Sequence, residues 1–160
     1  DELTTDIMAY MKRQHNILIG ERTAEQIKIH VGSALPKLET PLDDFAVNGR
    51  DLMTGIPKQI TVTYQEIAHA LDESIMAIEE AVIRALEATP PELASDIYRT
   101  GLYLTGGGAL LRGLDKRIAS KTRLPVHIAE DPLRAVVRGT SKALADTERF
   151  MPILIPRGSV

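Results

Sequence analysis

Three consecutive glycines, Gly106 to Gly108, constrain the fold of this sequence more than any other feature. The run before them, Gly101-Leu102-Tyr103-Leu104, is apolar and aromatic and is typical of a short buried strand. The residues after them show a helical spacing of three and four in Leu111, Leu114 and Ile118. The pattern therefore predicts a strand, a glycine turn and a helix in immediate succession.

A glycine turn at this place has two interpretations. Glycine lets the backbone take positive φ and lets a ligand approach with no Cβ in the way, and a helix N-terminus suits a phosphate. The same triplet could equally form a tight turn that binds nothing, because its spacing is not that of a Rossmann fingerprint or a P-loop. The residues alone leave both interpretations open.

Composition excludes several classes of protein. Hydrophobic residues make up 44% of the 160 residues, enough for a core in one domain or two small lobes. The net charge of −3 argues against a nucleic-acid-binding module, which would carry a basic excess. The chain has no cysteine, and its four histidines show no metal-ligand spacing, so no metal site is predicted. No apolar run approaches the roughly 20 residues of a membrane helix.

Helical patterns cover much of the chain. A first helix is predicted over residues 2–16, with Leu3, Ile7 and Met11 on one face. Capping boxes at Thr23–Gln26 and Thr63–Glu66 predict the starts of two more helices. Their predicted inward positions are Ala24, Ile27, Val31 and Ala34 in the first, and Ile67, Leu71, Ile75, Ile78, Val82 and Leu86 in the second. Pro90-Pro91 ends the longer helix, a short helix is expected over 92–97, and a last one from Asp131 to about Asp146.

Strand and turn signals lie between these helices. Phe45-Ala46-Val47 followed by Asn48-Gly49 predicts a hairpin turn at the last two residues. Gly55-Ile56-Pro57 predicts another turn, and strands are expected over 58–62 and 125–128. The charged residues Glu79, Glu80 and Arg84 are expected on a solvated helix face, and Lys116-Arg117 on a solvated face or a partner contact.

The order of elements favours an α/β fold with a helix-and-hairpin insertion. Only two strands flank the glycine turn, which is few for a sheet, so further strands are expected upstream of Asp1. Since the chain also begins without Met, we expect it to be part of a longer protein. The tail around Ile155–Ser159 is similar to a protease-cleavage linker added for expression and carries no fold argument.

Several motifs in the same order resemble one protein family. The segment from Leu104 to Leu114 resembles the second adenosine motif of the actin-like ATPases. The flanking segments Ile19–Lys28, Pro90–Ile97 and Ala129–Leu133 make the resemblance more specific. Together, from Asp1 to about Asp146, they resemble the MreB family of bacterial actins.

The resemblance implies that this chain is the second lobe of an actin-like ATPase. Such a lobe has a partial RNase H-like sheet with flanking helices and a small α+β inserted subdomain. The implied division is a larger subdomain of residues 1–34 and 96–150, an inserted one of 35–95, and a tail of 151–160. The phosphate loops, the catalytic glutamate, the Mg²⁺-associated aspartates and the membrane-binding segment belong to parts of the family's fold that this sequence does not contain. No catalytic residue or metal ligand is therefore assigned, and whether the chain alone is an enzyme stays open.

The resemblance also implies an adenosine site made of two segments. The family's Glu-x-x-Lys corresponds to Glu25 and Lys28, where the acid binds ribose hydroxyls and the lysine stem covers adenine. The alternative for this pair is an exposed ion pair without a ligand. The implied cofactor is ATP or ADP with Mg²⁺, and the implied binding residues are Glu25, Gln26, Ile27, Lys28, Gly106, Gly107, Gly108 and Ala109.

The implied function is that of an ATP-binding cytoskeletal protein that directs rod cell shape and cell-wall synthesis. Its implied partners are further copies of itself in a head-to-tail filament, a RodZ-type membrane partner and the cell-wall elongation machinery. The implied location is the cytoplasm, at the inner face of the bacterial inner membrane. Two alternatives stay open: a non-enzymatic interaction lobe that docks a RodZ-type partner, and a lobe of another actin-superfold ATPase such as a sugar kinase or a DnaK-type chaperone.

Overall fold

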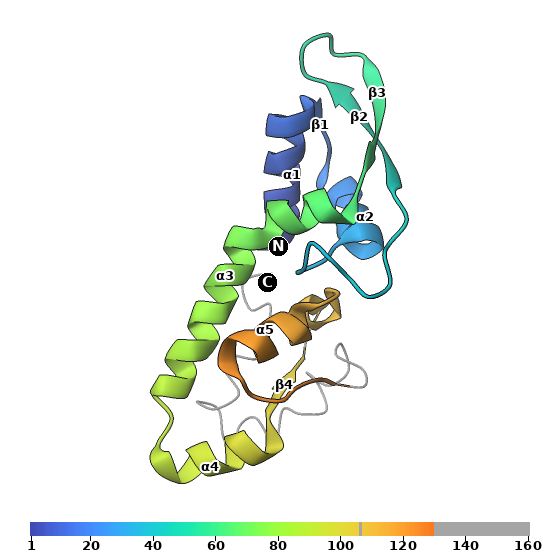
Figure 1. Ribbon diagram of the computed structural model, residues 1–160. Coiled ribbons are helices and arrows are strands. Elements are labelled where there is room, and N and C mark those ends of the chain that lie inside the picture. Colours follow the sequence, from blue (N-terminus) through green and yellow to red (C-terminus); the bar gives the residue numbers. More distant parts are fainter. Residues whose placement is uncertain (106, 130–160) are drawn as a thin grey trace. The chain divides into compact units, whose positions relative to one another are not determined.

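The computed structural model describes residues 1–105 and 107–129, and these belong to two compact units, Asp1–Ile75 and Met76–Val160 (Figure 1). We call them unit 1 and unit 2 and describe each by itself. The helix predicted from Asp131 to Asp146 lies outside the described residues. The division differs from the predicted subdomains 1–34 with 96–150 and 35–95, which stay a prediction.

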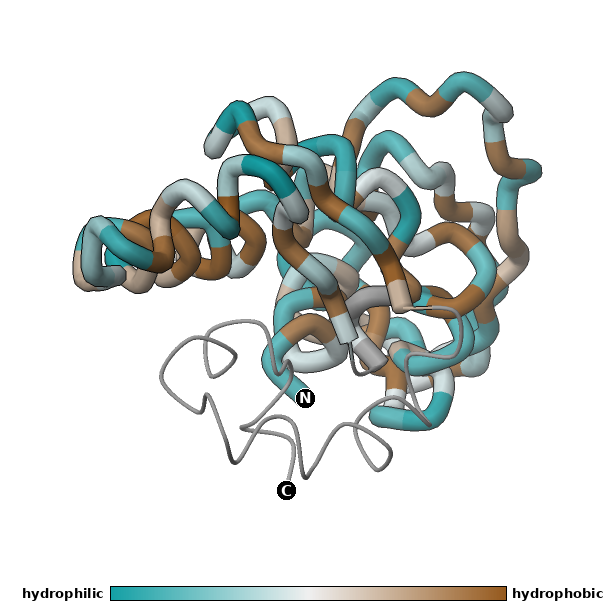
Figure 2. Tube along the Cα trace, turned by 90° about the horizontal axis from the view of Figure 1, so that it is seen from below, coloured by the Kyte–Doolittle hydropathy of each residue, from teal (hydrophilic) through white to brown (hydrophobic). Residues whose placement is uncertain are grey.

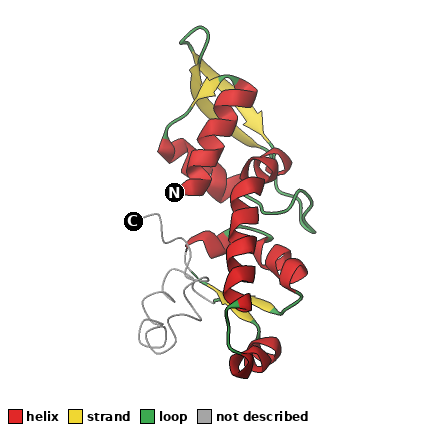
Figure 3. Ribbon diagram, turned by 90° about the vertical axis from the view of Figure 1, so that its left-hand side faces the viewer, coloured by secondary structure: helices red, strands yellow, loops and turns green. Residues whose placement is uncertain are grey.

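Unit 1 combines a three-stranded antiparallel sheet with helices (Figure 3). The sheet order is β1-β2-β3, with Ile17 opposite Asp51 and Phe45 opposite Val62. Helix α1 packs on α2 and β1, and α2 packs on β2. The elements in order are α1 (Glu2–His15), β1 (Ile17–Leu18), α2 (Glu21–Val31), β2 (Phe45–Asp51), β3 (Pro57–Val62) and the first half of α3 (Tyr64–Glu87).

The core of unit 1 is aliphatic and follows the predicted helical faces. Ile7 and Met11 of α1 and Ile27 and Val31 of α2 are fully buried, as is Ile67 of α3. Hydrophobic and hydrophilic residues alternate along the helical tubes in Figure 2, as amphipathic helices require. The predicted inward faces of α1 and α2 are therefore confirmed, as are Ile67, Leu71 and Ile75 in the first half of α3, whereas Ile78 and Leu86 further along α3 are only half-buried.

The start of α3 confirms the capping box at Thr63–Glu66. The Glu66 backbone N–H donates to Thr63 Oγ1 over 3.2 Å, and the Thr63 N–H donates to Glu66 Oε2 over 3.2 Å. The other carboxylate oxygen, Oε1, lies 2.6 Å from His15 Nε2 at the end of α1. The box therefore also joins α3 to the first helix. The box predicted at Thr23 is wrong, because α2 begins at Glu21, with Gly20 as N-cap, three residues earlier than predicted.

The hairpin turn predicted at Asn48-Gly49 is also wrong. Strand β2 continues through both residues, and the chain reverses between Asp51 and Pro57. The Asp51 carboxylate accepts the N–H groups of Met53 and Thr54, and Gly55 takes φ +73°, so the turn has its own cap and its own left-handed glycine. At Gly49 an added Cβ would lie 2.6 Å from Leu18 O, so glycine serves close packing of β1 rather than a turn.

Unit 2 confirms the strand–turn–helix–strand order. Strands β4 (Leu102–Leu104) and β5 (Val126–Ile128) pair in parallel, with Leu102 opposite Val126. Between them lie the 3₁₀ helix η1 (Gly107–Leu110) and α5 (Leu114–Thr122), and before them α4 (Pro91–Thr100) and the second half of α3. Parallel strands joined by a helix are the βαβ arrangement of α/β proteins. The predicted face of Leu111, Leu114 and Ile118 is buried.

One ion pair in unit 2 corrects the predicted solvated faces. Glu79 of α3 is 6% exposed and its carboxylate binds the guanidinium of Arg117 on α5. Its neighbour Glu80 is exposed and lies 4.0 Å from Arg84, as expected of a solvated face. The spacing within α3 could not distinguish the two glutamates, because the partner of Glu79 comes from another helix.

Candidate functional site

The residues of the implied adenosine site belong to both units. Glu25, Gln26, Ile27 and Lys28 lie on α2 in unit 1, whereas Gly107, Gly108 and Ala109 lie in η1 in unit 2. Gly106 lies outside the described residues. The two segments are therefore described separately.

The glycine segment joins the end of a buried strand to a helix in two steps. Leu104, the last residue of β4, is buried, and η1 begins at Gly107 as a single 3₁₀ turn. Helix α5 starts only at Leu114, with Gly113 as a left-handed N-cap at φ +80°. The helix therefore begins later than the sequence pattern predicted, because the 3₁₀ turn and the N-cap Gly113 precede it.

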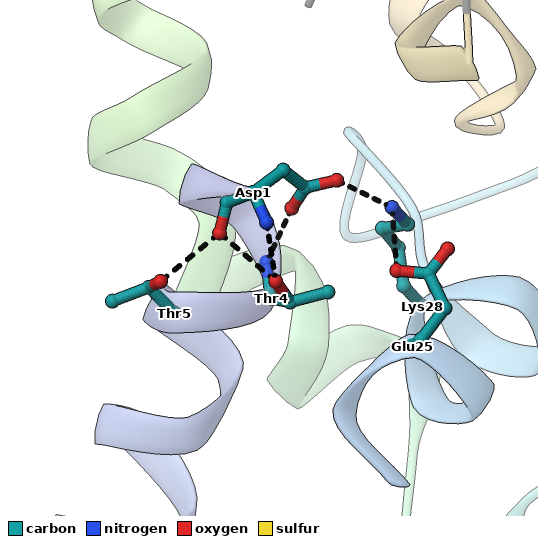
Figure 4. A network of polar contacts seen from close by, with 5 residues as sticks. All are labelled: Asp1, Thr4, Thr5, Glu25 and Lys28. Atoms are coloured by element: carbon teal, nitrogen blue, oxygen red, sulfur yellow. Dashed lines mark hydrogen bonds and ion pairs between the residues drawn. The ribbon is translucent and has the colours of Figure 1, made fainter. Parts of the chain in front are cut away.

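The α2 segment presents an ion pair and a lysine that is mostly buried (Figure 4). Lys28 Nζ lies 3.0 Å from Glu25 Oε2, one helical turn earlier. The side chain of Lys28 is 16% exposed and that of Glu25 is 45% exposed, so the carboxylate is the group more open to solvent. Between them in sequence, Gln26 is exposed and Ile27 is fully buried, so a ligand could contact Ile27 only through its backbone.

A second carboxylate, that of Asp1, also binds the ammonium of Lys28. Asp1 Oδ2 lies 2.7 Å from Lys28 Nζ, and the Asp1 side chain is also 16% exposed. Sequence reasoning missed Asp1, which lies 27 residues from Lys28. The Asp-x-x-Thr spacing of Asp1 and Thr4 could have marked Asp1 as a helix cap, but not its contact with Lys28.

Asp1 is also the N-cap of α1. Its Oδ1 accepts the Thr4 N–H over 2.7 Å, and its amino group donates to Thr4 Oγ1 over 2.9 Å. Its carbonyl oxygen accepts the hydroxyls of Thr4 and Thr5. One carboxylate therefore fixes the first turn of α1 and the lysine of α2 at the same time.

The cluster of Asp1, Glu25 and Lys28 has two negative groups around one positive group. Such a group suits hydroxyls and an apolar ring better than a phosphate, because carboxylates accept from hydroxyls and repel anions.

Residues 1–105 and 107–129 contain no group of three or more His, Cys, Asp or Glu side chains placed to hold a metal ion. Within the same residues, no helix is long and apolar enough to cross a membrane.

Comparison with known proteins decides the family. The family model for the MreB/Mbl protein matches residues 1–151. The chain belongs to the MreB/Mbl family. The resemblance of its motifs to the bacterial actins is thereby confirmed.

The MreB/Mbl relatives are longer than this chain. The cell shape-determining protein MreB of Escherichia coli is 49% identical over 144 residues, which is 90% of this chain and 41% of that protein. The cell shape-determining protein Mbl of Bacillus cereus is 44% identical over 150 residues, which is 94% of this chain and 44% of that protein. The chain thus spans less than half the length of these relatives.

Solved structures confirm the fold class. MreB 5 of Spiroplasma citri bound to AMPPNP matches with a TM-score of 0.82 at 37% identity, over 94% of this chain and 44% of that one. The MamK double helical filament matches with a TM-score of 0.67 at 20% identity, over 90% and 43%, which concerns the fold alone. The chain is therefore a fragment of an actin-like ATPase fold with mixed α/β structure.

Proposed function

We propose that this chain supplies the adenosine side of the nucleotide site in an actin-like protein that determines cell shape. The observation that carries the proposal is the geometry on α2. There, the carboxylate of Glu25 is open to solvent, and one turn later the stem of Lys28 is held in place by Asp1, so that the cluster suits hydroxyls and an apolar ring. A relative of the same fold, 37% identical, has been solved with AMPPNP and with ADP, which supports a nucleotide as the ligand.

In this proposal each predicted residue has a role. Glu25 accepts hydrogen bonds from the ribose hydroxyls, and the apolar stem of Lys28 covers adenine. Gly106, Gly107, Gly108 and Ala109 let the backbone lie against the nucleoside and the α-phosphate. Mg²⁺ accompanies the phosphates, and its ligands are expected in the half of the family's fold that this sequence does not contain.

The wider function follows from the family and is part of the same proposal. ATP binding governs head-to-tail assembly into filaments, since a heterologous contact that does not close makes an open polymer. The filament lies in the cytoplasm at the inner face of the inner membrane. There it directs cell-wall synthesis together with a RodZ-type membrane partner and the elongation machinery.

The alternative is an interaction lobe that does not bind nucleotide. It is favoured by the β2–β3 hairpin, where Leu52, Met53 and Ile56 are 39%, 83% and 61% exposed within five residues. Exposed apolar side chains of this kind often mark a protein contact. The second alternative, a lobe of another actin-superfold ATPase, is disfavoured because the MreB/Mbl family model matches residues 1–151.

Thermal unfolding of the chain with and without millimolar Mg–ADP tests the proposal. A ligand that binds only the folded state stabilises it by about 1.4 kcal/mol at a tenfold excess over Kd. We expect the midpoint to rise in the wild-type chain, and the rise to disappear in Lys28→Ala and Gly107→Val. Lys12→Ala, which removes an exposed lysine of α1, is the matched control and should keep the rise. No rise in the wild-type chain contradicts nucleotide binding and favours the interaction lobe.

A further inference from the structure

We propose that Asp1 is a positioning residue for the nucleoside. In this inference, which rests on the proposed function, Asp1 holds the ammonium of Lys28 away from the ligand, so that only the lysine stem faces adenine. The same carboxylate also caps α1. The first turn of α1 is therefore part of the nucleoside site although it does not touch the ligand.

The contacts around Lys28 support this role. Its Nζ lies 2.7 Å from Asp1 Oδ2 and 3.0 Å from Glu25 Oε2, so two carboxylates bind the ammonium. Glu25 is the more exposed acid and lies on the same helix, whereas Asp1 is 16% exposed and belongs to another helix. The contact with Asp1 therefore restrains Lys28 more than the contact with Glu25 does. Asp1 caps the separate helix α1, so it cannot move together with a lysine of α2.

The geometry of Asp1 explains why the restraint is firm. Its Oδ1 accepts the Thr4 N–H over 2.7 Å, so the carboxylate cannot rotate away without uncapping α1. An unrestrained lysine ammonium would extend into water and carry its stem along, because an ammonium is strongly hydrated and its stem is flexible. With the ammonium bound, the stem stays as a fixed apolar surface.

A set of variants separates positioning from folding. Asp1→Asn keeps an N-cap of equal quality but loses the charge that binds Lys28. Lys28→Met keeps an apolar stem of similar length and removes the ammonium that needs restraint. Thr4→Val removes the reciprocal half of the capping box and leaves the contact between Asp1 and Lys28, so it controls for a weakened α1.

Isothermal titration of the chain with Mg–ADP is the first measurement. We expect Asp1→Asn to weaken binding about fivefold, which corresponds to ~1 kcal/mol, and Thr4→Val to stay within about twofold of the wild-type chain. The double variant Asp1→Asn with Lys28→Met should bind like Lys28→Met alone, because no ammonium is left to position. A double variant as weak as Asp1→Asn overturns the inference, since Asp1 would then act through folding or through the ligand itself.

The second measurement needs no nucleotide. In ¹⁵N-labelled chain the Lys28 ammonium protons should give a protected NMR signal, which Asp1→Asn removes and Thr4→Val keeps. Survival of that signal in Asp1→Asn overturns the restraint whatever the titration shows.

If the wild-type chain binds no ADP, the proposed function fails, and the nucleotide role of Asp1 fails with it. If the wild-type chain binds ADP and Asp1→Asn binds it equally well, only the inference fails.

Discussion

Adding one methyl group at Gly49 should destabilise unit 1, and the structure gives the size of the effect. An added Cβ would lie 2.6 Å from the backbone oxygen of Leu18 and 2.7 Å from Cγ1 of Ile17. Ordinary contacts begin near 3.4 Å, so β1 and β2 would have to separate by about 0.8 Å. Leu18 pairs with Arg50 and Ile17 is fully buried, so neither can move freely.

We expect Gly49→Ala to lower the free energy of unfolding by about 1–2 kcal/mol. Overpacking at a closely packed position costs about 1–3 kcal/mol, and the reduced entropy of the unfolded chain returns roughly 0.4–1 kcal/mol of it. The matched control is Gly20→Ala, where an added Cβ meets nothing within 4 Å. There the gain in the unfolded state and the poorer N-cap roughly cancel, so a change within about 0.5 kcal/mol is expected.

Urea unfolding followed by circular dichroism measures both variants. The midpoint of Gly49→Ala should fall with the slope m unchanged, because only the folded state is altered. The reasoning is refuted if Gly49→Ala is as stable as Gly20→Ala. In that case β1 can shift at little cost, and the close packing seen at Gly49 would not be what requires a glycine there.

Two further predictions concern charged groups. Glu79→Gln should lower the unfolding free energy by about 3 kcal/mol, because it removes the negative charge from a largely buried ion pair with Arg117. Glu80→Gln next to it should change stability by less than about 0.5 kcal/mol in the same urea titration, and equal effects of the two would contradict the assignment. Hydrogen bonds from the backbone N–H groups of Thr54 and Met53, with Lys58 nearby, hold the pKa of Asp51 below its ordinary value. Its contribution to stability is therefore present above about pH 4 and is lost as the pH falls through the lower folded-state pKa. The difference in urea midpoint between the wild-type chain and Asp51→Asn should accordingly shrink on acidification, and a difference that is constant with pH would be the opposite result.

Local sequence signals predicted the elements that local forces determine. The capping box at Thr63–Glu66 marked the start of α3, because both of its hydrogen bonds join residues three apart. The spacing of Leu114 and Ile118 gave the buried face of α5, because residues four apart lie on the same face of a helix. Spacing alone could not identify the fold. The family resemblance did, because it predicted that the chain is part of an actin-like ATPase fold.

The misses share a different cause. Asn48-Gly49 has the residues of a hairpin turn, but the role of Gly49 is set by Ile17 and Leu18, about 30 positions away. Glu79 looks like its exposed neighbour until Arg117 of another helix is placed beside it. Asp1 entered the candidate site only through its contact with Lys28, 27 residues later. Contacts between distant residues leave no periodic signal in the sequence, so these assignments needed the structure.

The shared carboxylate of Glu66 has a consequence for the order of folding. Its bond to Thr63 closes a loop of a few residues and can form early, whereas its bond to His15 joins residues 51 positions apart. Closing a longer loop costs more chain entropy, and contacts of large sequence separation slow folding. We therefore expect the first turn of α3 to exist before α1 docks against it. When α1 docks, the carboxylate of Glu66 that binds His15 is then already held in place by the capping box.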